Sequence, residues 1–289
     1  MKPRDVHGSA HKVEASYPVR RVGVAFLSAV PIGLVGTLIG LGGAEFRLPL
    51  LVGVLGYSSR RAVPLNLAIS FLTLGMALFV RGRVLPWGQV MAFWPLLGAL
   101  LLGSLSAAFW GAGWLPRLRQ SHLERAIFGL LAGLGLLLIV EAGVPLLPAG
   151  RGLATGAAQY PVAFIAGLGI GLVSSLLGVA GGELIIPTLI FIFGMEIKLA
   201  GSASVLIGLL TVTIGLLRHL HQGRLSPQEG LQVILPMGAG TFLGAWLAGP
   251  LLGQIAPGAL KFLLGLILLV SAWRVFRPTR AHAAGADAE

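Results

Sequence analysis

The sequence predicts an all-α polytopic membrane protein, built as two tandem repeats of about five hydrophobic segments each. Of the 289 residues, 56% are hydrophobic and 11% are charged, whereas a soluble globular domain has roughly 25% charged residues. The mean hydropathy is +0.89, and apolar runs follow one another along nearly the whole chain. In addition, the second half of the sequence repeats the first.

The apolar runs define ten segments, near residues 22–42, 44–57, 62–81, 88–111, 123–142, 160–180, 183–194, 200–218, 229–252 and 257–274. Lipid offers no hydrogen-bond partner to an open backbone, so these segments are expected to be membrane helices or the halves of broken ones. Eight are long enough for full spans of a ~30 Å hydrocarbon core, at about 20 residues per span. The second and seventh segments are short, and whether they complete a crossing is left open.

The segments divide the chain into five expected regions. These are a cytoplasmic tail (1–19), a first transmembrane repeat (20–143), a linker (144–159), a second transmembrane repeat (160–277) and a disordered C-terminal tail (278–289). The first apolar run follows Arg20 and Arg21, and its length favours an uncleaved helix over a signal peptide.

The internal repeat is clear around one glycine-rich stretch. GLVGTLIGLGGAEFRLP at 33–49 aligns with GLVSSLLGVAGGELIIP at 171–187, with identity at eight of seventeen positions. The same offset pairs Thr73 with Thr211, and after a shift of three residues the match continues into later segments. An odd number of crossings in each half would invert the second repeat relative to the first.

The net charge of +11 does not indicate a nucleic-acid partner, because the Lys and Arg residues lie at the ends of apolar runs. That placement is typical of topology signals, with positive residues on the cytoplasmic side. Ten crossings put 15 Lys and Arg on the side of the N-terminal tail and 5 on the other, against 13 and 7 if the short segments re-enter. We therefore expect a multi-pass protein of the cell (cytoplasmic) membrane with both termini in the cytoplasm.

In each half a long segment runs into a glycine cluster, and a short segment with an early Glu and Pro follows. The clusters are Gly40, Gly42 and Gly43 in the first half and Gly178, Gly181 and Gly182 in the second. The short segments have about 13 residues, or ~20 Å at 1.5 Å per residue, so each is expected to begin inside the membrane. Pro49 and Pro187 are the expected helix-breaking residues.

A helix N-terminus inside the membrane favours an anion, because its main-chain N–H groups carry partial positive charge. We therefore predict that the six glycines bind a small anionic substrate; the alternative is that they only allow a tight re-entrant turn. Asn66, Ser202 and Ser204 follow the short segments. They are predicted either to donate hydrogen bonds to the anion or to cap the next helix.

Three charged residues lie inside apolar segments near these clusters. A buried charge costs roughly 2.5–3.5 kcal/mol and indicates function, so Glu45 and Glu183 are predicted to carry coupling protons, or else to cap their own helices. Arg47 has Ile185 at its repeat position. It is expected either to pair with Glu183 or to contact the substrate through its planar fork.

Other chemistries lack their residues. The chain has no Cys, which excludes disulfides and thiolate sites. His219 and His221 are two apart rather than four, and neither HExxH nor a phosphate-binding loop occurs. We therefore predict a protein that is not an enzyme and uses no metal or cofactor, with secondary or passive transport in the lipid bilayer. The oligomeric state is left open.

At the two glycine motifs the sequence resembles the sulfite-exporter family of membrane permeases, the TauE/SafE type, over nearly the whole chain. The resemblance implies transport of sulfite, sulfonates or related sulfur anions, driven by H⁺ or another coupling ion. It places functional residues at Gly40, Gly43, Glu45, Pro49, Gly178, Gly181, Gly182, Glu183 and Pro187. The first half departs from the pattern, with Pro64 and Asn66 where the second has Ser202 and Ser204. A cation- or metal-coupled permease and a non-transport membrane scaffold are the alternatives.

Overall fold

The computed structural model describes residues 19–114, 120–144, 152–177, 181–221, 223, 225 and 230–276. Residues 1–18 of the expected N-terminal tail, the expected C-terminal tail, residues 145–151 of the expected linker and Gly178 lie outside these ranges. In the part described, the chain forms helices and connecting turns and no strand. The elements are α1 (Val19–Ile39), α2 (Ala44–Pro49), η1 (Leu50–Val54), α3 (Ser59–Val84), α4 (Trp87–Ala92), α5 (Trp94–Trp114), α6 (Gln120–Gly143), η3 (Gly156–Ala158), α7 (Gln159–Leu177), α8 (Gly182–Phe191), α9 (Ile197–His221), η4 (Gly230–Ile234), α11 (Leu235–Gln254) and α12 (Pro257–Phe276).

The all-helical fold class is confirmed, and each of the ten expected segments is helical. Among the described residues, five stretches are long and apolar enough to cross a membrane by length and composition: Val22–Ile39, Arg61–Val84, Gly156–Val173, Ile197–His221 and Gln232–Gln254. Four shorter apolar helices lie at Trp94–Ala107, Ile127–Gly143, Gly182–Phe191 and Pro257–Trp273. The protein is therefore a multi-pass membrane protein.

The glycine clusters interrupt the helices, as expected. Between α1 and α2, Gly40, Gly42 and Gly43 have φ angles of 99°, 77° and 72°. In the second half Gly181 has φ 75° and precedes α8 directly. Because this left-handed region is strained for any residue with a Cβ, the glycines are what allow the chain to leave α1 and restart as α2 within a few residues.

The two prolines do not break their helices as expected. Pro187 lies inside α8, which continues to Phe191, so the prediction for Pro187 was wrong. Pro49 is the last residue of α2, and the chain goes on directly as the π-helix η1. Each proline follows its glutamate by four residues, so its missing N–H removes one bond to that residue's carbonyl group near the helix start. A π-helix follows the proline in the first half, whereas the α-helix continues past it in the second.

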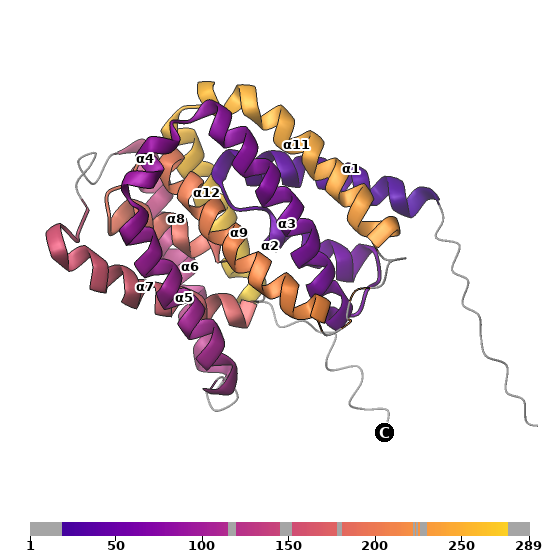
Figure 1. Cartoon of the computed structure of the whole chain (residues 1–289), viewed down its shortest axis with the longest axis horizontal. Helices are drawn as coiled ribbons and strands as arrows, with labels where there is room; N and C mark the ends of the chain where they lie inside the picture. The colour runs from indigo at the N-terminus through magenta and orange to yellow at the C-terminus, as the bar shows by residue number, and fades with distance from the viewer. Residues whose placement is uncertain are drawn as a thin grey trace, which may run out of the picture.

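The body of the protein consists of four tightly packed helix pairs: α1 with α11, α5 with α7, α6 with α12 and α3 with α9. Each pair joins one helix from the first half of the chain to one from the second. In Figure 1, α11 runs along α1 at one edge of the molecule, and α3 and α9 lie beside each other in the middle. The two halves of the chain are therefore interlocked rather than folded as separate lobes.

Glycines allow the main chains of these pairs to touch. A Cβ added at Gly244 of α11 would lie 2.0 Å from the carbonyl oxygen of Val30 on α1. One added at Gly103 of α5 would lie 2.1 Å from that of Phe164 on α7. Such close packing replaces the hydrophobic drive that helices lack in lipid.

The α3–α9 seam is antiparallel and has a seven-residue period. At each step a side chain of α3 lies over a glycine of α9: Leu67 over Gly215, Leu74 over Gly208 and Arg81 over Gly201. The period keeps one face of each helix toward the other along the whole seam. Its third position is occupied by a guanidinium group where the first two have leucine.

Candidate functional site

The two helix breaks come together in the interior. A Cβ added at Gly182, the first residue of α8, would lie 3.4 Å from the Cα of Leu41 in the first break. It would also lie 3.3 Å from the Oγ of Ser204 on α9. Gly40 in turn contacts the main chain of Gly201, since a Cβ there would be 2.3 Å from the Gly201 carbonyl oxygen. The first break is therefore enclosed by the start of α8 and the first turns of α9.

Both predicted coupling acids lie beside this junction and are buried. Glu45 is in the first turn of α2 and Glu183 in the first turn of α8. Each follows a glycine of its break within two residues along the chain. Ser271 of α12 donates a 2.5 Å hydrogen bond from its Oγ to Oε1 of Glu183. The two acids thus form one cluster, to which α2, α8 and α12 contribute.

Arg47 is completely buried, and neutral oxygen atoms hold it. Its Nε donates to Oδ1 of Asn66 at 3.3 Å, and its Nη1 to Oγ1 of Thr73 at 2.7 Å. Its Nη2 donates to Oγ of Ser70 at 2.7 Å and to the carbonyl oxygen of Gly42 at 2.8 Å. The three side chains are spaced by four and three residues, so they share one face of α3.

The expected ion pair between Arg47 and Glu183 is therefore wrong. In the described structure the guanidinium of Arg47 faces α3 and the first glycine break, and no salt bridge joins it to Glu183. The physical reason is that three polar side chains on successive turns of α3 match the fork of the guanidinium group. Asn66 is engaged on its other side as well, because its Nδ2 donates to the carbonyl oxygen of Ala44 at 3.2 Å.

The two serines predicted to meet substrate differ in their surroundings. Ser202 is engaged twice: its Oγ accepts a 3.0 Å hydrogen bond from Nε of Arg81 and donates to the carbonyl oxygen of Lys198 at 3.1 Å. Ser204 is just as buried, yet its Oγ has no hydrogen-bond partner within the described residues. Of the predicted polar side chains, Ser204 is thus the one whose hydroxyl group is still available to a ligand.

Comparison with known proteins decides the family. The family model of the sulfite exporter TauE/SafE matches residues 2–138 and 163–288. The chain belongs to the TauE/SafE family. The resemblance seen at the glycine motifs is confirmed, and the family is one of membrane transporters. No curated protein and no solved structure gave a match in the corresponding searches.

In this TauE/SafE protein, four polar residues next to the junction escaped prediction from sequence. Ser70 and Thr73 had a signal, because together with Asn66 they form a polar stripe at helical spacing on an otherwise apolar segment. Arg81 had none, since a basic residue near the end of an apolar run is usually a topology signal. Ser271 had none either, because a single serine in a transmembrane helix commonly bonds its own backbone.

Proposed function

We propose that the protein is a secondary transporter that moves a small sulfur-containing anion, such as sulfite or an organosulfonate, across the cytoplasmic membrane. The anion binds where the two glycine breaks meet, between Leu41, Gly182 and Ser204. One observation carries the proposal: the buried hydroxyl group of Ser204 lacks a hydrogen-bond partner in the described structure and lies 3.3 Å from the Cβ position of Gly182. A buried hydroxyl group without a hydrogen-bond partner is costly, so a ligand that accepts a hydrogen bond from it would be stabilised there.

The start of α8 supports an anion rather than a cation at this place. α8 has ten residues, begins inside the protein and has Gly181 as its N-cap residue, which has no side chain to cover the first amides. The N–H groups of Leu184 and Ile185 already bond the Gly181 carbonyl oxygen, each at 3.0 Å. The positive end of the α8 dipole therefore faces the junction, where a negative oxygen is favoured.

The difference between the halves supports one anion site rather than two. The repeat offset puts Arg47 opposite Ile185 and Asn66 opposite Ser204. In the first half, Arg47 donates to Asn66 and fills that place with a protein cation. In the second half, isoleucine has no donor to offer, so the equivalent place beside Ser204 is left for a substrate oxygen.

The acid cluster supports coupling to protons. Glu45 and Glu183 lie next to the proposed anion site, each in the first turn of the helix that follows its glycine break. An anion that enters beside two carboxylates is repelled in a low-dielectric interior, unless a proton neutralises one of them. We therefore propose that Glu45 and Glu183 take up the coupling proton as substrate binds.

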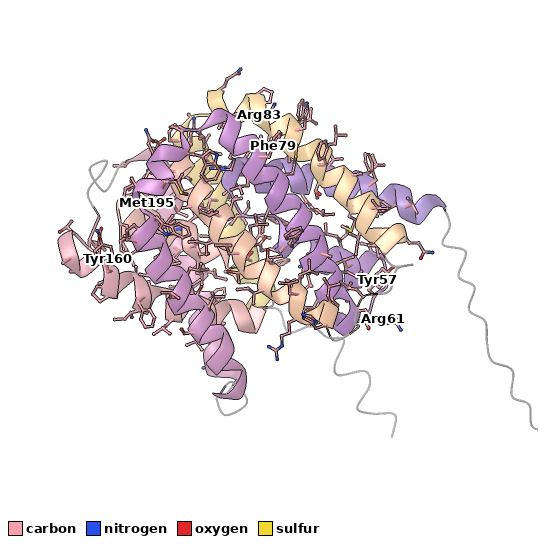
Figure 2. The ribbon with its side chains drawn as sticks, in the orientation of Figure 1. Tyr57, Arg61, Phe79, Arg83, Tyr160 and Met195 are labelled. Atoms are coloured by element: carbon pink, nitrogen blue, oxygen red, sulfur yellow. The ribbon has the colours of Figure 1, made fainter. Side chains whose placement is uncertain are left out.

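The packing supports two inverted halves with ten crossings. If each helix is replaced by its counterpart in the other half, the α1–α11 pair becomes the α7–α5 pair. The same replacement leaves the α3–α9 and α6–α12 pairs unchanged. This pairing is what a two-fold relation between repeats requires, as in other inverted-repeat transporters. In Figure 2, Arg61 and Arg83 lie at opposite ends of α3, the former near Tyr57 and the latter at Phe79. Together with the charge count, this arrangement supports the proposal that both chain termini lie in the cytoplasm.

Uptake into proteoliposomes tests the proposal. Purified full-length protein is reconstituted and given labelled sulfite, an organosulfonate, sulfate and a carboxylate in turn. We expect sulfur-anion uptake above protein-free vesicles. A hydrogen bond to a charged group contributes about 1.5–3 kcal/mol, so Ser204→Ala should lower kcat/KM roughly 10-fold or more. Equal uptake with and without protein would refute the proposed function.

Ser104→Ala is the matched control. Ser104 is also buried, but its Oγ donates to the carbonyl oxygen of Leu101 within α5 at 2.9 Å, away from the junction. Loss of this local bond should leave kcat/KM within about twofold of the wild-type value. If Ser104→Ala and Ser204→Ala reduce uptake equally, the anion does not bind at Ser204.

A further inference from the structure

The end of α1 creates a hydrogen-bonding problem that the protein must solve in its interior. The last four carbonyl groups of an α-helix have no partner within the helix, and at membrane depth water does not supply one. The first of them is satisfied locally, because the carbonyl oxygen of Gly36 accepts from the amides of Gly40 and Leu41 at 2.8 and 3.0 Å. Those of Thr37, Leu38 and Ile39 need donors from elsewhere.

Arg81 of α3 provides two of these donors. Its Nη1 bonds the carbonyl oxygen of Thr37 at 2.7 Å and that of Leu38 at 3.1 Å. The carbonyl oxygen of Ile39 is covered by Gly201, where an added Cβ would lie 2.2 Å away. The three remaining carbonyl groups of α1 thus meet a side chain of α3 and the backbone of α9.

The same guanidinium also holds the first turns of α9. Its Nη2 donates to the carbonyl oxygen of Lys198 at 2.6 Å and its Nε to Oγ of Ser202 at 3.0 Å. Only 1% of Arg81 is exposed, and no salt bridge to it occurs in the part of the chain that the structure describes. Arg81 therefore connects helices of both halves through neutral oxygen atoms.

The choice of arginine at this position follows from its partners. Leucine fills the two preceding steps of the α3–α9 seam, and a third leucine would offer no donor to α1. Burial of a guanidinium is costly unless its N–H groups are bonded. Four of the five N–H groups of the Arg81 guanidinium are bonded, and three of the four acceptors are main-chain carbonyl oxygens. The partial negative charge at the C-terminus of α1 stabilises the cation further.

We propose that Arg81 is a positioning residue of the transport site. It fixes the first glycine break against α9. It thereby sets the distance between Leu41 and Ser204, the two residues between which the anion is proposed to bind. Ser202 belongs to this clamp and does not contact the substrate. The effect on transport rests on the proposed function, whereas the effect on the end of α1 does not.

The test uses a reporter thiol in the last turn of α1. The chain has no Cys, so Thr37→Cys introduces a single thiol at a fully buried position. Arg81→Met keeps most of the side-chain volume and removes every donor. In this background we expect a small thiol reagent to react at position 37 at least tenfold faster than with Arg81 present. We also expect KM for sulfite to rise at least tenfold, with membrane insertion within twofold of wild type.

Arg81→Lys and Arg83→Met complete the set. Lysine keeps the charge but has one nitrogen in place of three. In Arg81→Lys, the labelling rate at position 37 and the KM should therefore lie between those of wild type and those of Arg81→Met. Arg83 is exposed and lies 4.4 Å from the ring centre of Phe79, so Arg83→Met should change neither quantity. If Arg81→Met does not insert, intermediate values in Arg81→Lys support the clamp.

Two results would overturn the inference. One is a labelling rate and a KM that equal the wild-type values both in Arg81→Lys and in any Arg81→Met protein that inserts into the membrane. The other is failure of Arg81→Lys to insert, which would assign Arg81 to folding alone. The labelling rate requires no transport. If the wild-type protein moves no sulfur anion, the proposed function fails while the labelling still decides the role of Arg81.

Discussion

Leu41 and Gly182 lie against each other although they come from different repeats: a Cβ on Gly182 would be 3.4 Å from the Cα of Leu41. That distance is an ordinary van der Waals contact, so a methyl group at Gly182 would touch Leu41. Ser204 borders the same space at 3.3 Å. A carbon atom added at Gly182 would therefore lie against both residues that are proposed to border the anion.

Gly182→Ala should therefore separate folding from transport. Alanine favours a helix over glycine by roughly 1 kcal/mol, so thermal stability in detergent should be unchanged or slightly higher, while anion uptake falls at least tenfold. Gly40→Ala is the contrasting variant. It requires a φ of 99° and places a Cβ 2.3 Å from the Gly201 carbonyl oxygen, so it should lower the stability itself. Full transport by Gly182→Ala would show that the substrate does not occupy this space.

A double-mutant cycle should distinguish the partners of Arg47. The 2.7 Å bond to Thr73 predicts a coupling free energy of about 1 kcal/mol or more between Arg47→Met and Thr73→Val. Coupling between Arg47→Met and Glu183→Gln should be smaller, because no salt bridge joins these residues. Unfolding in detergent measures both cycles. If Glu183→Gln recovered the stability lost in Arg47→Met, the result would support an ion pair between Arg47 and Glu183, which the structure lacks.

Glu45→Gln should uncouple transport from protons. Without an ionisable group at position 45, an imposed pH gradient should no longer accumulate substrate, whereas exchange of labelled for unlabelled anion continues. Vesicle assays with and without the gradient measure the two activities. Glu196→Gln is the control, because Glu196 is exposed at the start of α9. Gradient-driven uptake that survives Glu45→Gln would exclude this residue as the proton carrier.

The ion pair between Lys261 and Glu141 should stabilise the α6–α12 contact. Its Nζ and Oε1 atoms are 3.2 Å apart, with 19% and 4% of the side chains exposed. Lys261→Met removes the cation from beside a buried carboxylate, a loss of about 3 kcal/mol, and should lower the thermal stability. Glu141→Leu combined with Lys261→Met should recover most of that loss, because no charge remains. Wild-type stability of Lys261→Met would mean that the pair contributes nothing.

Ten crossings predict opposite membrane sides for the two ends of α3. Single thiols introduced by Arg61→Cys and Arg83→Cys, both at exposed positions, can be labelled in a chain that otherwise has no Cys. An impermeant reagent should reach position 61 from the cytoplasmic side and position 83 from the outer side. Labelling of position 83 from the cytoplasm would contradict the ten-crossing arrangement.

The elements that sequence analysis placed correctly are those set by local composition. The ten apolar segments became helices, because a chain in lipid must satisfy its backbone hydrogen bonds within each segment. Gly40, Gly42 and Gly43 indicated the first break, and their positive φ angles explain why no other residue type would serve. Pro187 was misread because a proline within the first turns of a helix is tolerated.

Sequence by itself thus determined the family, the helical segments and the position of the glycine breaks, all of which depend on residues near one another along the chain. Only the tertiary structure decided which buried polar groups meet. Arg47 has Glu45 two residues away but bonds the polar stripe of α3, and Arg81 bonds carbonyls more than forty positions distant. The physical reason is that the partner of a buried donor depends on which helix faces cross, and this follows from the packing of the whole bundle.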